Sequence, residues 1–233
     1  MVRFQYHPDI LATFPALVGG VILAANTRSG PTPDALAGLY TQEQQAVVRR
    51  IGATPLSEIP SLAAWRAAFR KFNVDPTQYR SAAEALLRRL TKKGDIPGIN
   101  TLVDIGNLVS IRYALPVAVF DTRAIQGAIT VHFADGTEPF VPLDQAEAEY
   151  PEPGEVIFSD AAKQVAARRW CWRQSDHSAA RNGTTEAIIT VEAHHAAART
   201  DVQAALDDLT ALLASHAGAA CTSALLDKDH PAF

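Results

Sequence analysis

The residues best placed to do chemistry lie in the segment Leu102–Asp121, LVDIGNLVSIRYALPVAVFD. Apolar residues recur at helical spacing through its first half, which predicts an amphipathic helix packed on a core. Asp104, Asn107 and Ser110 follow one another at intervals of three and project from a neighbouring stripe of that helix. A carboxylate, an amide and a hydroxyl need hydrogen-bond partners if they are buried. They therefore form either a structural network, which the spacing alone favours, or one wall of a polar pocket.

Other familiar catalytic patterns are missing from the sequence or have unsuitable spacing. It contains no G-x-S-x-G, H-E-x-x-H, Walker or G-x-G-x-x-G motif. His194 and His195 end a predicted strand, where adjacent side chains point to opposite faces, so they do not readily bind one metal. Asp176, His177 and Ser178 include the three residue types of a catalytic triad, but sequence neighbours rarely reach the required geometry. We therefore expect no metal and no cofactor.

Length and composition are those of an ordinary globular protein. The 233 residues are 48% hydrophobic, the net charge is −4, and the chain is long enough for a substantial core. It has only two cysteines, Cys171 and Cys221, which is typical of a reducing compartment. No stretch resembles a signal peptide or reaches the length of a membrane span. We expect a cytoplasmic protein that does not enter a membrane.

The charges are divided between two neighbouring parts of the chain. Residues 61–125 contain ten Lys and Arg against five Asp and Glu, whereas residues 126–160 contain eight Asp and Glu and no Lys or Arg. A basic part beside an acidic part favours binding of a polyanion on one face, although a solvated helix surface explains the pattern equally well. The isoelectric point near 6.0 argues against strong non-specific nucleic-acid binding, and no DNA partner is expected.

Helical spacing and capping residues predict further helices in the first half and near the C-terminus. Thr41–Ile51 and Thr200–Leu213 each open with a T-x-x-Q capping box, and Ser61–Phe72 carries an apolar stripe. A Ser-Ala-Ala-Glu box at Ser81 opens another helix. The outer faces of this helix carry four cations: Arg88, Arg89, Lys92 and Lys93. Cations near the C-terminal end of a helix are favoured by its dipole, which explains the cluster without a ligand.

The strand candidates are apolar or alternating runs bounded by turn residues. Ala16–Ala25 is expected to be a buried strand. Beyond Asp121 five shorter strands are predicted, at Ala128–Phe133, Pro139–Leu143, Glu155–Phe158, Arg168–Arg173 and Ala187–Ala193. This order favours an α+β (mixed α/β) fold, with helices in the N-terminal half and a mostly antiparallel or mixed sheet in the C-terminal half. We expect one compact domain over residues 1–233, with its core at roughly 61–193 and a final helix at 200–213.

The second half of the chain resembles a known domain in several ordered motifs. The run VDIGN at Val103–Asn107, followed by LP-x-x-x-FD at Leu115–Asp121, is similar to the B3/B4 domain of phenylalanyl-tRNA synthetase β-subunits. The similarity continues through Thr137–Leu143 and the PGEVIFSD segment Pro153–Asp160, and it ends with Thr185–Glu192. A closer resemblance is to free-standing B3/B4-domain proteins of bacteria. It rests on three segments: Phe69–Leu90, Ile96–Ser110 and Arg168–Asp176.

The resemblance implies a mixed α/β fold whose pocket receives the 3′ end of an aminoacyl-tRNA. In the synthetase this domain hydrolyses tyrosine wrongly esterified to the tRNA for phenylalanine. The sequence has no sign of the separate module that synthesises aminoacyl-tRNA, so synthesis is not expected. The histidine of the family's P-x-H-x-F-D motif falls on Ala118, which neither transfers a proton nor donates a side-chain hydrogen bond. Ester hydrolysis needs a positioned water and a stabilised oxyanion, and it does not strictly require that histidine.

The resemblance also indicates polar candidates for the pocket: Asn100, Asp104, Asn107, Arg173, Gln174, Ser178, Thr185 and Glu192. Glu192 could orient a water or recognise an α-amino group, and Arg173 could bind a phosphate or pair with Asp176. For any single one of these residues, an ordinary ion pair or helix cap is the slightly favoured explanation. Trp170 and Trp172 alternate on a predicted strand and share one face, where they pack in the core or stack on a base.

The function expected from the resemblance is binding of aminoacyl-tRNA 3′ ends and hydrolysis of a mischarged amino acid in trans, with tRNA as the partner. An enzyme of this kind is an aminoacyl-tRNA ester hydrolase. The alternative is a non-catalytic RNA- or amino-acid-binding module that has lost the chemistry, which Ala118 favours. The side chains expected to contact RNA phosphates are basic: Arg70, Lys71, Arg80, Arg88, Arg89, Lys92 and Lys93.

Overall fold

The computed structural model describes residues 3–143 and 145–233; Met1, Val2 and Asp144 lie outside the described residues. The helices are α1 (Pro8–Thr13), α2 (Asp34–Ile51), α3 (Pro60–Lys71), α4 (Ala82–Lys93), α5 (Thr101–Tyr113) and α6 (Ala198–Ala217), with 3₁₀ turns η1 (Leu56–Glu58) and η2 (Thr122–Ala124). The strands are β1 (Phe4–Tyr6), β2 (Val18–Ala25), β3 (Val117–Asp121), β4 (Ile129–Phe133), β5 (Val156–Ser159), β6 (Val165–Arg168), β7 (Arg173–Gln174), β8 (Glu186–Ala193) and β9 (Ala220–Leu226). No helix in these described ranges is long and apolar enough to cross a membrane.

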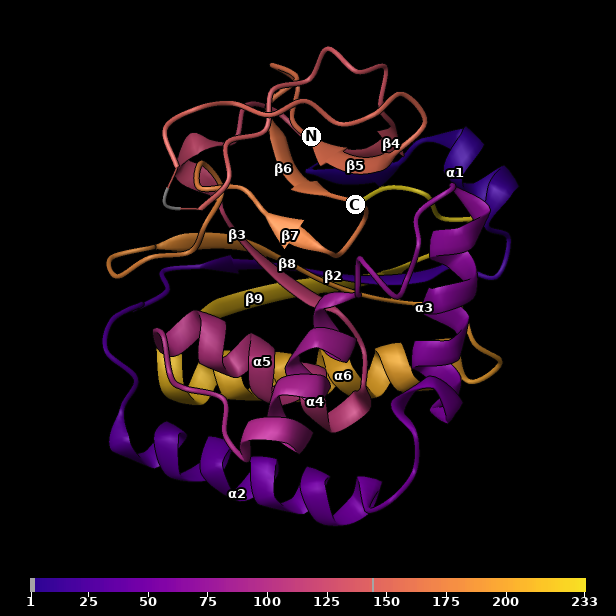
Figure 1. Cartoon of the computed structure of the whole chain (residues 1–233). Helices are drawn as coiled ribbons and strands as arrows, with labels where there is room; N and C mark the ends of the chain where they lie inside the picture. The colour runs from indigo at the N-terminus through magenta and orange to yellow at the C-terminus, as the bar shows by residue number, and fades with distance from the viewer. Residues whose placement is uncertain (1–2, 144) are drawn as a thin grey trace.

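The strands pair in two sheets, which are stacked one above the other in Figure 1. The upper one, sheet A, has the order β1-β4-β5-β6-β7, in which only the β1–β4 pair is parallel. The lower one, sheet B, has the order β3-β8-β2-β9 and is antiparallel throughout. Strand β2 lies between β8 and β9, so the N-terminal part of the chain supplies a central strand of sheet B.

Helices cover the face of sheet B that points away from sheet A (Figure 1). Helix α6 contacts β2, β8 and β9, helix α5 contacts β3, and α2 and α4 pack against α5. The close approach of α6 requires a glycine in β2, because a Cβ on Gly20 would lie 2.8 Å from Leu206 Cγ. The predicted helix with polar residues on a core-like face is α5, and it is therefore an internal helix of this layer.

Strand β8 divides the interior into two hydrophobic clusters, because its side chains alternate between the two faces of sheet B. Ile189 and Val191 join the cluster between sheet B and the helices. Ile188 joins the cluster between the two sheets. Glu192, four positions later, lies on the same face as Ile188. The alternation therefore places a carboxylate between the sheets, where it needs hydrogen-bond partners.

Only one of the three predicted capping boxes is present. Ser81 Oγ accepts a hydrogen bond from the backbone N–H three residues later at 3.3 Å, and α4 follows directly, which confirms that prediction. The two T-x-x-Q predictions are wrong. Helix α2 begins at Asp34, so Thr41 lies inside it, and α6 begins at Ala198, so Thr200 lies in its first turn. A threonine hydroxyl inside a helix can bond to the preceding turn, as Thr41 does here, so the pattern does not by itself mark a helix start.

The mixed α+β class is confirmed, but the expected layout is not. Strands β1 and β2 come from the N-terminal part, and the strands form two sheets. The strand predicted at Arg168–Arg173 is wrong, because β6 ends at Arg168 and positive φ angles at Arg169 and Trp170 turn the chain. Pro139–Leu143 forms isolated bridges in place of a strand. The remaining predicted strands are present, with ends shifted by one or two residues.

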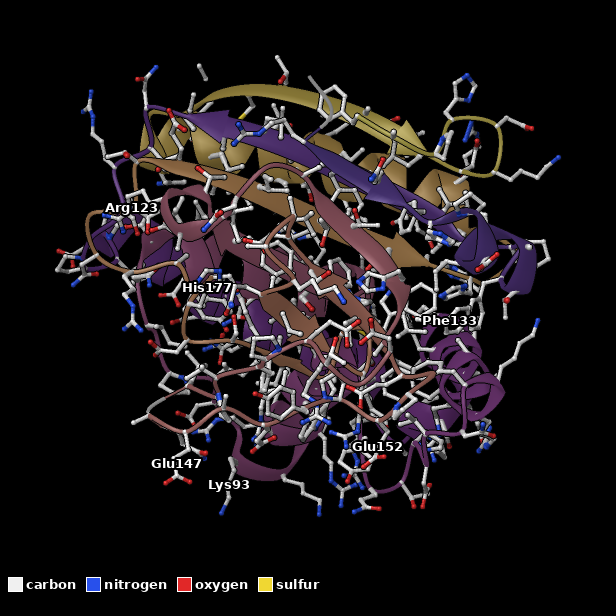
Figure 2. The ribbon with its side chains drawn as sticks, turned by 90° about the horizontal axis from the view of Figure 1, so that it is seen from above. Lys93, Arg123, Phe133, Glu147, Glu152 and His177 are labelled. Carbon is white, nitrogen blue, oxygen red and sulfur yellow. The ribbon has the colours of Figure 1, made fainter. Side chains whose placement is uncertain are left out.

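The acidic stretch of the sequence forms much of the connection between β4 and β5. Glu147 and Glu152 are exposed there, and Glu147 projects outward at the edge of the view in Figure 2. Arg168 of β6 is buried beneath this connection, with its Nε 3.0 Å from Glu155 Oε1 and its Nη1 2.8 Å from Glu149 Oε2. Two of the acids therefore neutralise a buried cation.

Candidate functional site

A cavity of about 70 Å³ lies between the two sheets. Most of its apolar lining residues come from β3 and the residue before it, sheet A and the turn after β6: Pro116, Val117, Ala118, Phe158, Ala167 and Trp170. Polar side chains also reach it: Arg173, Gln174, Thr190 and Glu192. Glu192 is the one carboxylate among its described lining residues. The cavity thus combines mostly apolar walls with a single acid, which is the composition of a small-ligand site.

Glu192 is buried in the cavity wall, with 2% of the residue exposed. Its Oε1 accepts hydrogen bonds from the Tyr6 hydroxyl at 2.7 Å and from Trp170 Nε1 at 3.1 Å. No hydrogen bond from the described residues reaches its Oε2. Burial raises the pKa of Glu192 to about 7, although the two donors lower it. A carboxyl group that titrates near neutrality can both accept and release a proton, as a general acid or base must.

A glycine in β2 allows the N-terminal strand to reach this carboxylate. Gly19 is the register partner of Glu192 across β2 and β8. A Cβ on Gly19 would overlap the Tyr6 hydroxyl oxygen, so a side chain there would displace Tyr6. Burial raises the pKa of Tyr6 well above its usual value, so its hydroxyl remains a donor. Because Tyr6 ends β1 of sheet A, its hydrogen bond to Glu192 joins the two sheets.

Trp170 closes the inner end of the cavity. Its φ angle of 59°, together with 44° at Arg169, turns the chain inward after β6. The buried indole packs edge-on against Phe14 and Trp65, with ring centroids 4.9 Å and 5.2 Å away. The neighbouring His194 has its pKa lowered to about 3 by burial, so it stays neutral at physiological pH. This aromatic cluster excludes water from one side of the carboxylate, which accounts for its raised pKa.

Cys171 follows Trp170 in the wall but is not suited to nucleophilic attack. Burial, together with the charge of Glu192, raises the pKa of the thiol well above its usual value. The thiolate is the reactive form of cysteine, so Cys171 stays an unreactive thiol at neutral pH. Its carbonyl oxygen accepts a hydrogen bond from Ala82 N at 2.8 Å, which attaches the start of α4 to the cavity wall.

Replacing Glu192 with glutamine is expected to make folding stability less dependent on pH. Folding favours the neutral form, because the pKa of Glu192 rises from 4.5 in the unfolded chain to about 7. Glu192 therefore stabilises the wild type most at a pH below its pKa in the unfolded chain. As the pH rises through its pKa in the folded protein, the free energy of unfolding falls by at most about 3 kcal/mol. Glutamine does not titrate, so the free energy of unfolding of Glu192→Gln should increase relative to that of the wild type between about pH 4.5 and 8. Urea unfolding across this range measures the difference.

The control for this prediction is Glu186→Gln, at the exposed start of the same strand. It should follow the wild type at every pH. Parallel curves for the wild type and Glu192→Gln would mean that Glu192 titrates in the folded protein as it does in the unfolded chain.

Aromatic and guanidinium groups form the outer rim of the cavity. The Arg169 guanidinium lies 3.9 Å from the Tyr79 ring centroid and 4.6 Å from that of Trp172. Arg173 lies 4.5 Å from the Trp172 centroid. Trp172 is thus part of a cation–π cluster at the rim, whereas Trp170 is in the core. The prediction that both tryptophans share one face of a strand is wrong.

A basic groove of about 410 Å³ runs along α4 from this rim, and Trp172 lines both the groove and the cavity. The groove is lined by five cations: Arg80, Arg88, Arg89, Lys92 and Lys93. Among the described acids, Glu84 lies 3.8 Å from Arg80 and Asp95 lies 3.9 Å from Arg89, while none pairs with the other three cations. The groove therefore presents unneutralised positive charge to solvent, and Lys93 projects outward in Figure 2.

The other two predicted RNA contacts lie outside this groove. Arg70 and Lys71 end α3 and are exposed. Lys71 Nζ donates to Thr13 O and lies 5.3 Å from the Phe14 ring centroid. The structure therefore brings together five of the seven predicted basic residues.

The polar residues of α5 are held in hydrogen bonds away from the cavity. Asn100 caps the helix, and its Nδ2 donates to Ala180 O at 3.0 Å. Asp104 is fully buried and accepts hydrogen bonds from Thr32 Oγ1 at 2.6 Å and from Ile99 N at 2.9 Å. These are the contacts of a structural network, the interpretation that the spacing favours.

Asn107 and Ser110, two further polar residues of α5, also lie away from the cavity. Asn107 is half-buried on α5, and the Ser110 hydroxyl donates to Leu115 O at 2.7 Å. Because α5 packs on the helix side of sheet B, neither residue lines the cavity on the other side.

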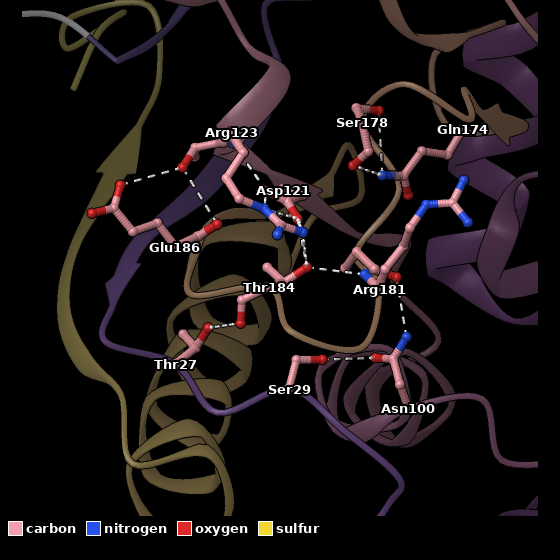
Figure 3. A network of polar contacts seen from close by, with 12 residues as sticks. Thr27, Ser29, Asn100, Asp121, Arg123, Gln174, Ser178, Arg181, Thr184 and Glu186 are labelled. Carbon is pink, nitrogen blue, oxygen red and sulfur yellow. Dashed lines mark hydrogen bonds and ion pairs between the residues drawn. The ribbon is translucent and has the colours of Figure 1, made fainter.

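The loop before β8 is held by the polar network drawn in Figure 3. Thr184 Oγ1 donates to Asp121 Oδ2 at 2.6 Å, which ties this loop to the end of β3. Ser178 is buried in the same network and accepts a hydrogen bond from Gln174 Nε2 at its carbonyl oxygen, at 2.9 Å. Thr185 is exposed at the start of β8. Ser178 and Thr185 therefore lie outside the cavity lining, and Gln174 lines it with its amide nitrogen already engaged.

Three of the eight predicted pocket residues line the cavity: Arg173, Gln174 and Glu192. Tyr6 is not among the predicted residues, because its contact with Glu192 spans 186 positions and leaves no local signal. Cys171 is not among them either, because it is an ordinary apolar-type wall residue. Among the described residues, no three His, Cys, Asp or Glu side chains are grouped so that they could hold a metal ion.

Comparisons with known proteins agree with this geometry. The family model described as "B3/4 domain" matches residues 64–218. The phenylalanine–tRNA ligase beta subunit of Photorhabdus laumondii is 26% identical over 136 residues, which cover 58% of this chain and 15% of the relative. That of Aquifex aeolicus is 30% identical over 98 residues, covering 42% of this chain and 12% of the relative. The chain thus spans only a small part of the length of these curated relatives.

A solved structure shows the same fold. It is an N-terminal fragment of the phenylalanyl-tRNA synthetase beta-subunit from Pyrococcus horikoshii, with a TM-score of 0.51 and 13% sequence identity. The match covers 94% of this chain and 50% of that one. Because the family model spans more than half of the chain, from α3 to the end of α6, the protein belongs to the B3/4 domain family.

Proposed function

We propose that this protein binds the 3′ end of an aminoacyl-tRNA and hydrolyses a mischarged amino acid from it in trans. The observation that carries the proposal is the position of Trp172, where the basic groove meets the cavity that holds Glu192. Phosphates of the acceptor end lie along the groove, and the aminoacyl group enters the cavity. The names of the relatives, which are tRNA ligase subunits, support tRNA as the partner.

The groove has the charge and residue types that suit a phosphate backbone. Arginine binds phosphate with two parallel hydrogen bonds, and lysine acts as a point charge. Arg173 is exposed at the mouth of the cavity and is the nearest cation for the last phosphate before the aminoacylated ribose. Binding of this kind releases counterions and weakens as salt is added.

Glu192 is the proposed general base for hydrolysis. A water at Oε2 gives its proton to that oxygen while the water oxygen attacks the ester carbonyl carbon. The bond from that carbon to the ribose oxygen then breaks, and the ribose oxygen leaves with the electron pair and takes up a proton. Tyr6 and Trp170 hold the carboxylate through its other oxygen. A base with a pKa of about 7 is ionised in a large fraction of molecules at neutral pH and still holds a proton well.

One observation favours a second candidate, a non-catalytic module that binds RNA or an amino acid. Ala118 lines the cavity, and none of the described lining residues is a histidine. A module without hydrolysis would keep the groove and the apolar walls and would use Glu192 to recognise an α-amino group.

The test is release of labelled amino acid from a panel of correctly and incorrectly charged tRNAs, with binding of uncharged tRNA measured alongside. Release of one mischarged amino acid above the spontaneous rate supports the hydrolase. Binding without release supports the non-catalytic module. Neither binding nor release would overturn the tRNA proposal.

The double charge reversal Arg88→Glu with Arg89→Glu is expected to weaken tRNA binding about tenfold or more. Each lost phosphate contact removes roughly one counterion, so the slope of log affinity against log salt should become shallower by about 2. Filter binding at several salt concentrations measures both quantities.

The matched control is Arg49→Glu with Lys228→Glu, which changes the net charge equally at exposed positions outside the groove. It should leave the salt slope near that of the wild type. Equal losses of affinity in the two double variants would show that overall charge, and not the groove, governs binding.

A further inference from the structure

We propose that the cavity admits only a small side chain, no larger than that of valine, and that the substrates of this protein are tRNAs carrying such amino acids. This inference rests on the proposed function and names the substrate class of that site. It departs from what the resemblance implies, since tyrosine is the amino acid removed by the synthetase domain.

The size of the cavity is the first argument. Its volume is about 70 Å³, whereas an apolar cavity that binds benzene in another protein has a volume of about 150 Å³. The available space is about half the volume of that benzene-binding cavity. A methyl, hydroxymethyl or isopropyl group fits without rearrangement of the walls.

The aromatic walls of the cavity are also fixed by packing and hydrogen bonds. Phe158 is buried between Phe4 and Phe120, with ring centroids 5.9 Å and 5.6 Å away. Trp170 is fixed at both ends, since its backbone N donates to Val156 O at 2.6 Å and its Nε1 donates to Glu192. Widening the cavity for a ring would displace packed aromatic groups of the core, which close-packed interiors resist.

The third argument is the chemistry of the walls. Ala118, Phe158 and Ala167 offer no polar atom on their side chains, so a side chain that packs against them loses its hydrogen bonds to water unless it reaches Arg173, Gln174, Thr190 or Glu192. Small aliphatic side chains lose nothing of this kind. The walls therefore reject large residues by volume, and their apolar part favours small aliphatic side chains over polar ones by desolvation.

The experiment uses one tRNA body charged by a ribozyme with alanine, valine, phenylalanine or tyrosine, each labelled. The protein should release alanine or valine at least about 100-fold faster than phenylalanine or tyrosine. The same four amino acids joined to the tRNA by a 3′-amide, which is not hydrolysed, give a binding readout. The two small amino acids should bind more tightly in this form.

Two variants change the cavity in opposite directions. Ala118→Val fills part of it and should slow release of valine about tenfold more than release of alanine. Phe158→Leu widens it and should raise the rate for phenylalanine relative to the wild type. Circular dichroism and thermal unfolding check that each variant is folded before its rates are compared.

The outcomes separate this inference from the function on which it rests. Faster release or tighter binding of small amino acids supports the inference. Release or binding of phenylalanine or tyrosine as strong as that of alanine overturns it and leaves the tRNA function in place. Neither release nor binding of any of the eight tRNAs overturns the proposed function, and the inference falls with it.

Discussion

Gly19→Ala is expected to lower the free energy of unfolding by about 4 kcal/mol. The added Cβ would overlap the Tyr6 hydroxyl oxygen and approach two ring carbons of Tyr6 to 2.9 Å. Forcing an extra methyl group into a packed core costs about 1–3 kcal/mol. Losing the hydrogen bond from Tyr6 to Glu192 costs about 1.5–3 kcal/mol more, because that bond ends on a charged group when Glu192 is ionised. Denaturant unfolding at pH 8 measures the sum.

The control is Gly38→Ala in α2. Gly38 is exposed, and a Cβ there meets no atom within 4 Å. Alanine favours the helix over glycine, so this variant should be more stable than the wild type by about 0.5–1 kcal/mol. If Gly19→Ala unfolded at the wild-type denaturant concentration, Tyr6 would be free to move aside, and its bond to Glu192 would contribute little to stability.

Gly19→Ala should also change the site. Tyr6 lowers the pKa of Glu192 by donating to it, so removing that donor should raise the pKa further above 7. Carbon NMR of labelled glutamate side chains would follow this titration directly. An unchanged pKa in a folded Gly19→Ala protein would mean that burial alone sets the value.

The sequence predicts the helices and strands whose pattern of apolar residues can be recognised from their own residues alone. Helix α5 and strand β2 are long and mostly buried, so their periodicity is visible without knowledge of their neighbours. Strand β9 is not predicted, because it is a partly exposed edge strand that begins with small and polar residues, and its register with β2 is set about 200 positions away. Strand β3 is not among the predicted strands either, yet it pairs with β8 along its whole length.

Only part of the candidate site can be predicted from the sequence, because the rest depends on contacts between residues that are far apart in it. Glu192 and the cations of α4 are found from motifs and composition. The cavity itself depends on how sheet A packs on sheet B and on the left-handed backbone of Arg169 and Trp170, which are bulky residues that rarely adopt positive φ. Alternation places Trp170 and Trp172 on one face, whereas this turn places one in the core and the other at the rim. Local periodicity carries no information about such a turn.

Ala118 has two consequences for the cavity that it lines. Its side chain supplies no proton-transfer group, and this favours a module without hydrolysis. It is also the smallest side chain of the β3 wall, so it preserves the little space that the cavity has. Alanine at position 118 can both replace the family's histidine and keep the cavity open if Glu192, on the neighbouring strand, performs the proton transfer.

Glu192→Gln is expected to reduce deacylation about 10³-fold and to leave binding of uncharged tRNA unchanged. Glutamine has the same shape and can still accept hydrogen bonds from Tyr6 and Trp170 through its carbonyl oxygen, but it does not take a proton from water. The wild-type rate should rise as the pH passes through about 7 and then level, because the ionised form of Glu192 is the base. The remaining rate of the variant should show no such rise.

Cys171→Ser is the matched control at the adjoining wall position, and it should keep its deacylation rate within a few-fold, since the thiol is protonated and takes no part. A large loss in this variant would move the chemistry from the carboxylate to the thiol. The kinetic pattern of Glu192→Gln separates the two roles that remain for the carboxylate. A lower rate at saturating aminoacyl-tRNA identifies a base, whereas weaker binding of aminoacyl-tRNA with an unchanged maximal rate identifies the residue that recognises the α-amino group.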